Sequence, residues 1–351
     1  MTVLAASSDR YSYDLPPSLA ASEPPEARGL TRDAVSMLVS YRGTGAVVPS
    51  SFVFLPTFLE PGDLLVVNTS GTIPAAIDAH SDEGTDLVIH LSTQLDDARW
   101  VVEPRRTVGR STERWVGAPP SGPLHLAGGA GLSLLEPYGE RGRLWIARLE
   151  LGRRTLTWLA LHGRPIRYGY VSGAWPIEAY QNVYATEPGS AEMPSAGRPF
   201  TAEAITRLVA KGVGVAPLVL HTGVASLEAD ELPYPERVTV PQPTAEQVNA
   251  ARRAGHRVIA VGTTVVRALE SSVGDDGDAH AYDGWTDLVI APDRDLLVTD
   301  GMLTGWHEPE SSHLMMLEAM AGRALLDVSY RAALALDYRW HEFGDVHLIL
   351  P

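Results

Sequence analysis

The chain of 351 residues contains no cysteine, and this absence excludes several kinds of site. Disulfide bonds, thiolate zinc sites, iron–sulfur clusters and cysteine nucleophiles all need the missing side chain. Apolar runs of about 18 residues, the length that spans a bilayer, are missing too. Residues 1–10 carry no basic segment followed by an apolar one. We therefore expect no secretory signal, no membrane partner and a cytoplasmic protein.

Basic residues are scarce relative to acidic ones. Lys and Arg together number 28 against 43 Asp and Glu, which gives a formal net charge of −15 at pH 7. A field of this sign repels nucleic acids at long range and attracts cationic small molecules. The arginines gather only in short, separated groups near 105–110, 153–167 and 252–257. Solvated surface positions are the simpler interpretation of each group, because a nucleic-acid partner needs a continuous basic patch.

The signatures of several common enzyme classes are also missing. The chain has no GxxxxGK[ST], GxGxxG, GxSxG or HExxH segment, which argues against P-loop, dinucleotide-binding, serine-hydrolase and zincin chemistry. The 11 histidines are scattered without pairs at metal-ligand spacing, so we expect no metal site.

Two patterns of hydrophobicity divide the chain. Between residues 73 and 158, short alternating apolar and polar segments are separated by turns rich in glycine, proline and serine, which indicates a small antiparallel barrel or sandwich. After Gly173, apolar runs alternate with helical periods, the pattern of helices that cover a sheet. We expect an α/β host domain formed by residues 1–72 and 159–351, with a smaller all-β, barrel-like domain inserted at 73–158.

The host pattern predicts individual elements. We expect helices at 201–212, 244–255, 264–271, 311–323 and 324–338, and strands at 35–41, 51–55, 64–67, 213–220, 257–261, 286–290 and 346–350. Thr201 and Thr244 are expected to be helix N-caps. The alternation in 155–161 predicts a further short strand of the insertion.

Polar residues follow two of the expected host strands, at the ends where ligands collect in α/β folds. The second of these turns begins a helix and offers backbone N–H groups and hydroxyls to a carboxylate. An unliganded threonine cap explains one such turn equally well, but two in one α/β unit favour a site. The residues concerned are His221, Thr222, Gly223, Gly262, Thr263, Thr264 and Arg267.

A third polar segment is the loop before the helix that Ser311 or Ser312 caps. It contains Trp306, whose ring face attracts cations, and His307, which is suited to proton transfer near neutral pH. A structural hydrogen bond is the alternative role for this histidine. Asp345 is a further carboxylate at the start of an expected strand. These residues predict a polar site at strand ends, but they select no particular reaction.

The same residues give the chain a resemblance to a known family, the S-adenosylmethionine:tRNA ribosyltransferase-isomerases of queuosine biosynthesis. The resemblance runs from Tyr13 to Asp345 and follows the family's order of segments. These are Pro61–Asn68, Ile73–Ala75, Tyr180–Ala185, Pro188–Ser190, Pro194–Gly197, Phe200–Thr201, Leu220–Gly223, Val258–Thr264 with Arg267, Thr286–Leu288, Leu303–Thr304, and His307 with Pro309 and Ser311. Each segment is a weak signal alone, and their common order makes the resemblance specific.

The resemblance implies the same two-domain fold, S-adenosylmethionine as co-substrate and no metal. In the implied reaction a base removes a ribose proton next to the sulfonium and adenine leaves. The aminomethyl group of 7-aminomethyl-7-deazaguanine in tRNA then attacks, and methionine departs as an epoxycyclopentane forms. His221, Glu236 and His307 have the right chemistry for the acid and base roles. The implied substrate-binding residues are Asn68, Thr222, Gly223, Gly262, Thr263, Thr264, Arg267, Thr304, Trp306, Ser311 and Asp345.

Several positions depart from the family's pattern. Gly71 and Ala76 stand where the family carries arginines, and Glu310 stands where it carries a lysine. Pro199 replaces a histidine, and Gly305 replaces an asparagine. Basic groups bind phosphate, so these changes fall on the positions expected to contact tRNA. Those positions match the family's pattern less closely than the positions expected to contact S-adenosylmethionine. The alternatives are therefore a divergent S-adenosylmethionine-dependent enzyme with a small-molecule acceptor, and a non-catalytic ligand-binding descendant.

Overall fold

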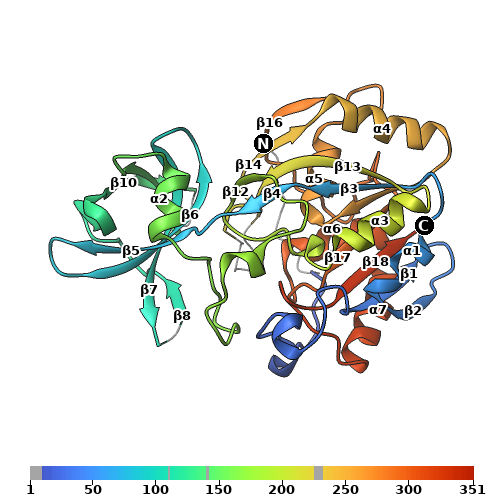
Figure 1. Cartoon of the computed structure of the whole chain (residues 1–351), viewed down its shortest axis with the longest axis horizontal. Helices are drawn as coiled ribbons and strands as arrows, with labels where there is room; N and C mark the ends of the chain where they lie inside the picture. The colour runs from blue at the N-terminus through green and yellow to red at the C-terminus, as the bar shows by residue number, and fades with distance from the viewer. Residues whose placement is uncertain (1–9, 110, 140–141, 225–231) are drawn as a thin grey trace.

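The structure, a computed structural model, describes residues 10–109, 111–139, 142–224 and 232–351. Two sheets organise it, and the smaller sheet forms a barrel that projects from one side of the larger α/β part (Figure 1). In the described parts of the chain, no helix is long and apolar enough to cross a bilayer.

The larger sheet has nine strands in the order β16-β14-β13-β3-β15-β17-β18-β1-β2. Their bounds are β1 (Ser36–Tyr41), β2 (Val47–Ser51), β3 (Leu64–Asn68), β13 (Gly214–His221), β14 (Glu236–Val240), β15 (Val258–Val261), β16 (Tyr282–Thr286), β17 (Gly301–Gly305) and β18 (Val346–Leu350). The central strands β13, β3, β15 and β17 are parallel neighbours, so their carboxyl ends meet at one edge. β14 and β18 run antiparallel to β13 and β17 and begin at this same edge.

Helices cover both faces of this sheet because its central strands are apolar on both sides. Along β3, Leu64 and Val66 enter one core with α4, α5, α6 and α7, while Leu65 and Val67 enter a second core with α1 and α3. The helices are α1 (Leu55–Phe58), α3 (Ala202–Ala210), α4 (Gln242–Arg253), α5 (Thr263–Ser271), α6 (Ser312–Ala321) and α7 (Arg323–Ala335). Thr201 caps α3 as expected, since its Oγ1 accepts a hydrogen bond from the Ala204 N–H at 3.0 Å.

The smaller sheet is antiparallel throughout and closes on itself. Its order is β11-β10-β9-β5-β6-β7-β8, and pairing between β11 and β7 completes the barrel. The strands are β5 (Ala76–Ser81), β6 (Asp86–Gln94), β7 (Arg99–Val108), β8 (Ser111–Arg114), β9 (Pro123–Leu126), β10 (Gly131–Tyr138) and β11 (Leu144–Glu150). This confirms the predicted class, an α/β host with an all-β barrel. The exact domain limits at 73 and 158 stay a prediction. The strand β4 (Ser70–Thr72) pairs with β12 (Glu187–Ser190) between the two parts (Figure 1).

The strand predicted at 155–161 is wrong, because this segment forms the helix α2 (Thr155–His162). Trp158 and Leu159 are buried in the barrel core, whereas Leu156 and Leu161 are exposed. Two adjacent buried residues flanked by exposed leucines do not fit a period of two. The short apolar run had no feature that separated a strand from a helix.

Three other expectations are corrected. The strand expected at 51–55 lies earlier, at β2, which ends at Ser51: Phe52, Leu55 and Leu59 are buried at helical spacing, and a 3-10 turn leads there into α1. The strand expected at 286–290 lies earlier, at β16, where it pairs with β14. Thr244 is not an N-cap, since α4 begins after Pro241 and the Thr244 hydroxyl donates to the Pro217 carbonyl at 2.6 Å. The other expected host elements begin and end near their expected limits, but the structure adds the strands β14 and β17, and β17 lies in a segment that was expected to be a loop.

Candidate active site

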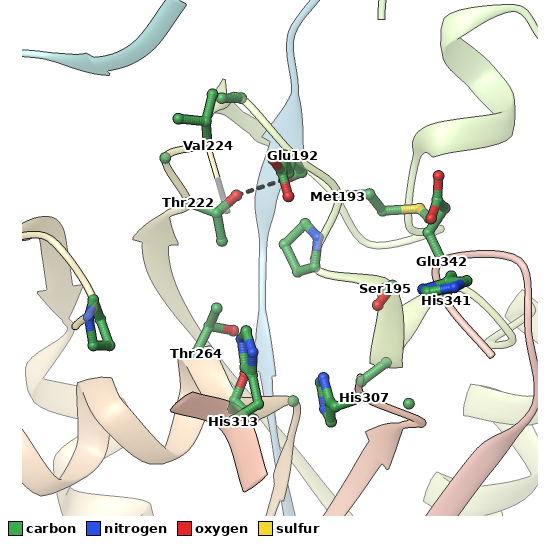
Figure 2. A pocket seen from close by; sticks show the side chains of 18 of the residues that line it. Glu192, Met193, Ser195, Thr222, Val224, Thr264, His307, His313, His341 and Glu342 are labelled. Atoms are coloured by element: carbon green, nitrogen blue, oxygen red, sulfur yellow. Dashed lines mark hydrogen bonds between the residues drawn. The ribbon is translucent and has the colours of Figure 1, made fainter. Parts of the chain in front are cut away.

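A cavity of about 310 Å³ opens at the edge where the central strands of the larger sheet end (Figure 2). Host segments that follow β13, β15 and β17 line it, together with the chain that returns from the barrel after α2. The predicted site residues that line this cavity are Thr222, Gly223, Glu236, Gly262, Thr263, Thr264, Arg267, Thr304, Trp306, His307 and Ser311. One cavity therefore collects residues from four separate stretches of the sequence.

The turn from β15 into α5 presents backbone N–H groups to the cavity. Gly262 occupies the N-cap position with φ 96°, a conformation that favours glycine, and its N–H donates to the Leu303 carbonyl at 2.8 Å. Thr263 and Thr264 follow in the first turn of the helix, whose leading N–H groups have no acceptor within the helix. The helix dipole and these hydroxyls favour an anionic group at this end of the cavity.

Glu236 and Arg267 form a buried ion pair at the cavity wall. The Arg267 Nη1 donates to Glu236 Oε2 at 2.6 Å, and Glu236 Oε1 accepts the Gly223 N–H at 3.0 Å. Arg267 also donates to the carbonyls of Tyr234, Thr286 and Leu288. Burial raises the pKa of Glu236, and the Arg267 charge opposes this shift. Both carboxylate oxygens of Glu236 are thus occupied by protein donors that shape the turn after β13.

Three predicted residues lie outside the cavity lining. His221 places Nδ1 2.7 Å from the Ser70 hydroxyl, behind the wall, and burial lowers the pKa of this imidazole. The Asn68 amide exchanges two hydrogen bonds with the Leu220 backbone and so ties β3 to β13 beneath the site. Asp345 accepts the N–H groups of Ser36 and Arg339, each at 2.7 Å. Their side chains hold the strand ends in place.

His307 forms a parallel stack with a histidine that sequence patterns did not single out. Its Nε2 lies 2.9 Å from the Thr304 hydroxyl, and its ring stacks on His313 with centroids 4.5 Å apart and planes 6° apart. Burial and neighbouring histidines hold the pKa of His307 well below its ordinary value. The Trp306 ring, in contrast, is 2% exposed and stacks on His347, so aromatic packing accounts for its position.

The sequence prediction missed one whole wall of the cavity. The residues of this wall come from the chain after α2, the loop after β12 and the loop after α7, none of which follows a central strand. They are Tyr168, Tyr170, Glu192, His341 and Glu342. The spacing of the two tyrosines was the one available signal, and by itself it does not indicate a binding site. In the described parts of the chain, no group of three or more His, Asp or Glu side chains is placed to hold a metal ion.

Comparison with known proteins places the chain in a family. Residues 8–349 match the family described as "Queuosine biosynthesis protein". The chain belongs to this family. Its relatives include the S-adenosylmethionine:tRNA ribosyltransferase-isomerases of Thermotoga maritima, 35% identical over 97% of this chain and 98% of the relative, and Symbiobacterium thermophilum, 36% identical over the same shares.

A solved crystal structure has the same fold. The crystal structure of the S-adenosylmethionine tRNA ribosyltransferase from Thermotoga maritima aligns with a TM-score of 0.54 and 29% identity, over 97% of this chain and 99% of that chain. Because the match extends over both parts of the chain, it includes the barrel as well as the α/β host.

The histidines of this family member are expected to titrate in two classes. Burial lowers the pKa of His313 and of His341 to about 4, whereas Asp276 raises the pKa of the exposed His280. We expect His313 and His341 to stay neutral at about pH 5.5, below the ordinary histidine pKa of about 6.5, while His280 is protonated. Histidine NMR titration measures this directly, and coincident titration of all three would contradict the buried environment.

The lowered pKa values of His313 and His341 also determine how these residues make the free energy of unfolding depend on pH. The folded-state pKa of these buried histidines lies below the unfolded value, so the unfolded chain binds more protons between about pH 6.5 and pH 4. Their contribution to the free energy of unfolding is complete above about pH 6.5 and is lost as the pH falls through that window.

Proposed function

We propose that this protein is an S-adenosylmethionine:tRNA ribosyltransferase-isomerase. It transfers and isomerises the ribosyl group of S-adenosylmethionine onto 7-aminomethyl-7-deazaguanine in tRNA, with release of adenine and methionine. The observation that carries the proposal is identity of about 35% to enzymes of this name over 97% of the chain. A tRNA substrate also supports the cytoplasmic location expected from the sequence.

The charges of the cavity support S-adenosylmethionine as co-substrate. The amino-acid carboxylate suits the start of α5, where Thr263 and Thr264 add hydroxyl donors. The sulfonium is a cation, and the stacked imidazoles of His307 and His313 are neutral at neutral pH and do not repel it. A cavity with one anion-binding end and uncharged bases beside it fits a zwitterionic sulfonium substrate.

Among the predicted acid and base residues, His307 is the best placed to move a proton. It lines the cavity, whereas His221 lies behind the wall and Glu236 is occupied by Arg267 and the Gly223 N–H. The Thr304 hydroxyl occupies His307 Nε2 and orients the ring, which leaves Nδ1 as the nitrogen for substrate. We assign to His307 a proton transfer at the ribose or at the departing adenine.

The direct test is product formation from S-adenosylmethionine. With tRNA that carries 7-aminomethyl-7-deazaguanine, we expect adenine and methionine to appear in equal amounts as the modified tRNA accumulates, measured by liquid chromatography and mass spectrometry. Absence of adenine release with this tRNA and with small-molecule amines would leave a non-catalytic ligand-binding role. Adenine release that needs only a small amine would favour the divergent small-molecule enzyme.

Binding of unmodified tRNA is expected to be weak and only mildly dependent on salt. The net charge is −15, and Gly71, Ala76 and Glu310 supply no cation where the family has one. The affinity falls as the salt concentration rises, and each missing phosphate contact makes the slope of log affinity against log salt concentration shallower by about one unit. A filter-binding titration over several salt concentrations measures both quantities. Sub-micromolar affinity with a steep salt slope would contradict this expectation and favour tRNA over a small-molecule acceptor.

A further inference from the structure

A second histidine of the cavity, His313, lies face to face with His307. Both rings line the cavity, with centroids 4.5 Å apart and planes 6° apart, and Figure 2 shows them side by side. The lone pair and the N–H group of a neutral imidazole lie in the plane of its ring, so rings arranged in this way meet through their faces and not through a hydrogen bond. His313 therefore touches His307 over a flat surface, as aromatic pairs do.

The backbone of His307 is anchored in the loop between β17 and α6. Its N–H donates to the Tyr330 hydroxyl at 3.4 Å. Its carbonyl accepts hydrogen bonds from the Tyr13 hydroxyl and from the Trp340 indole N–H, the latter at 3.3 Å. These bonds determine where the loop lies, but none of them reaches the imidazole. The direction of the ring therefore depends on the contacts of the ring itself.

Two contacts restrain the imidazole of His307. The hydrogen bond between its Nε2 and the Thr304 hydroxyl, 2.9 Å long, holds one ring atom. A single hydrogen bond does not fix the plane of a ring, and a ring that turns about its side-chain bonds breaks it. The flat face of His313 opposes that turn, because the ring would have to leave the stack. Together the two contacts set the plane in which Nδ1 can meet a substrate atom.

His313 is suited to support a neighbouring ring because it belongs to a packed helix. It is the second residue of α6, and Leu314, Leu317 and Met320 of the same helix are buried in the core beside the larger sheet. A side chain on a packed helix is placed more precisely than one on a loop. A ring held by the helix thus limits the movement of a ring that the loop carries.

The charges around the pair permit this contact. Burial lowers the pKa of His307 well below its ordinary value and that of His313 to about 4. The other groups that act on the pair are His341 and His347, whose pKa values burial also lowers, and Arg267, which opposes a positive charge on His313. Both rings of the stack are therefore uncharged at neutral pH, and no repulsion between like charges separates them.

We propose that His313 is the positioning residue for His307, and that the face of its ring holds the His307 imidazole in the orientation that transfers a proton. The proposal rests on the proposed function, in which His307 moves a proton at the ribose or at the departing adenine, and adds to it the residue that orients this group. Because His313 acts through its ring face, another flat ring at this position should serve, and a side chain without a ring should not.

The test compares substitutions that keep a ring at this position with substitutions that remove it. His313→Phe keeps a flat ring without nitrogens, and His313→Ala removes the ring. His313→Leu, which fills the space without a flat face, takes the place of the alanine variant if thermal melts show that the latter is unfolded. The control is His162→Ala, which removes an exposed imidazole that stacks on Trp158 with centroids 4.8 Å apart, in the barrel and outside the cavity lining.

Two measurements are made on each protein. Steady-state assays of adenine release give kcat and the KM for S-adenosylmethionine. Nitrogen-15 NMR at neutral pH reports which ring nitrogen of His307 carries the proton, and it needs no turnover. The His307 signal is identified by its loss in His307→Ala. A ring held against Thr304 and His313 keeps one tautomer, whereas a ring that turns away from the Thr304 hydroxyl has no single preferred site for its proton.

We expect His313→Ala to lower kcat by about 10²-fold, the scale of a misplaced catalytic group, and to change KM little. His313→Phe and the control should keep most of the wild-type kcat. The His307 signal should show one tautomer in the wild type, the control and His313→Phe, and averaged tautomers in His313→Ala.

Equal loss of kcat in His313→Phe and His313→Ala would overturn the proposal and assign the effect to the nitrogens of His313. Wild-type kcat in His313→Ala, or a fall in kcat without averaged tautomers, would overturn it too. If the wild type releases no adenine, the proposed function fails and the NMR comparison alone decides. Averaging confined to His313→Ala would then still support the positioning role, and the same His307 signal in every variant would overturn it.

Discussion

Replacing Arg267 with Met is expected to lower the free energy of unfolding by about 3–5 kcal/mol, the effect of breaking a buried ion pair by removing one partner. The Arg267 and Glu236 side chains are 6% and 16% exposed, so the remaining carboxylate would be left buried without its counter-charge. Three backbone carbonyls would also lose their donor. Urea unfolding followed by circular dichroism measures the change.

The control for this prediction is a surface pair on the barrel. Arg106 and Glu113 are 2.9 Å apart with both side chains 54% exposed, so Arg106→Met should cost about 0–1 kcal/mol. A double variant, Arg267→Met with Glu236→Met, should recover a large part of the loss because no buried charge remains. If Arg267→Met costs no more than Arg106→Met, the pair does not stabilise the site as described.

Replacing His307 with Ala is expected to reduce adenine release by about 10²–10⁴-fold, the usual contribution of a positioned acid or base. The fold should be retained, since the ring makes one hydrogen bond, to Thr304, and one stack, on His313. S-adenosylmethionine affinity should change by only a few-fold, so that the effect falls on kcat. Steady-state assays of adenine formation separate the two parameters.

His125→Ala is the matched control, because that imidazole is 60% exposed on the barrel and pairs with Asp82. Its adenine release should equal that of the wild type. Full activity in His307→Ala would remove His307 from the chemistry and direct attention to His313, the second imidazole of the stack.

The residues that follow strands made part of the site predictable. Parallel strands end at one edge of a sheet, so the sequence alone predicts that Thr222 and Thr263 lie near one another. The structure places both around one cavity, together with Thr304 of β17, a central strand in a segment that was expected to be a loop. The Thr201 cap was predictable for a similar reason, since it depends only on residues within one helical turn.

The direction in which a side chain points could not be predicted from the sequence in the same way. His221 ends β13 as expected, yet its ring faces Ser70 behind the wall instead of the cavity. Glu236 was a candidate for proton transfer, but in the structure both of its carboxylate oxygens accept hydrogen bonds from protein donors. Sequence patterns place a residue at a strand end and leave open which partner its polar atoms meet.

By itself, the sequence determined the division into an α/β host and an all-β barrel, the order of most host elements and the edge at which the site lies. These features depend on local periodicity, capping and the direction of neighbouring strands. Only the tertiary structure decided that α2 is a helix, that His307 stacks on His313 and that Tyr170 meets Glu342 in the cavity wall. Tyr170 and Glu342 are 172 positions apart, and packing between distant segments leaves no trace in either local pattern.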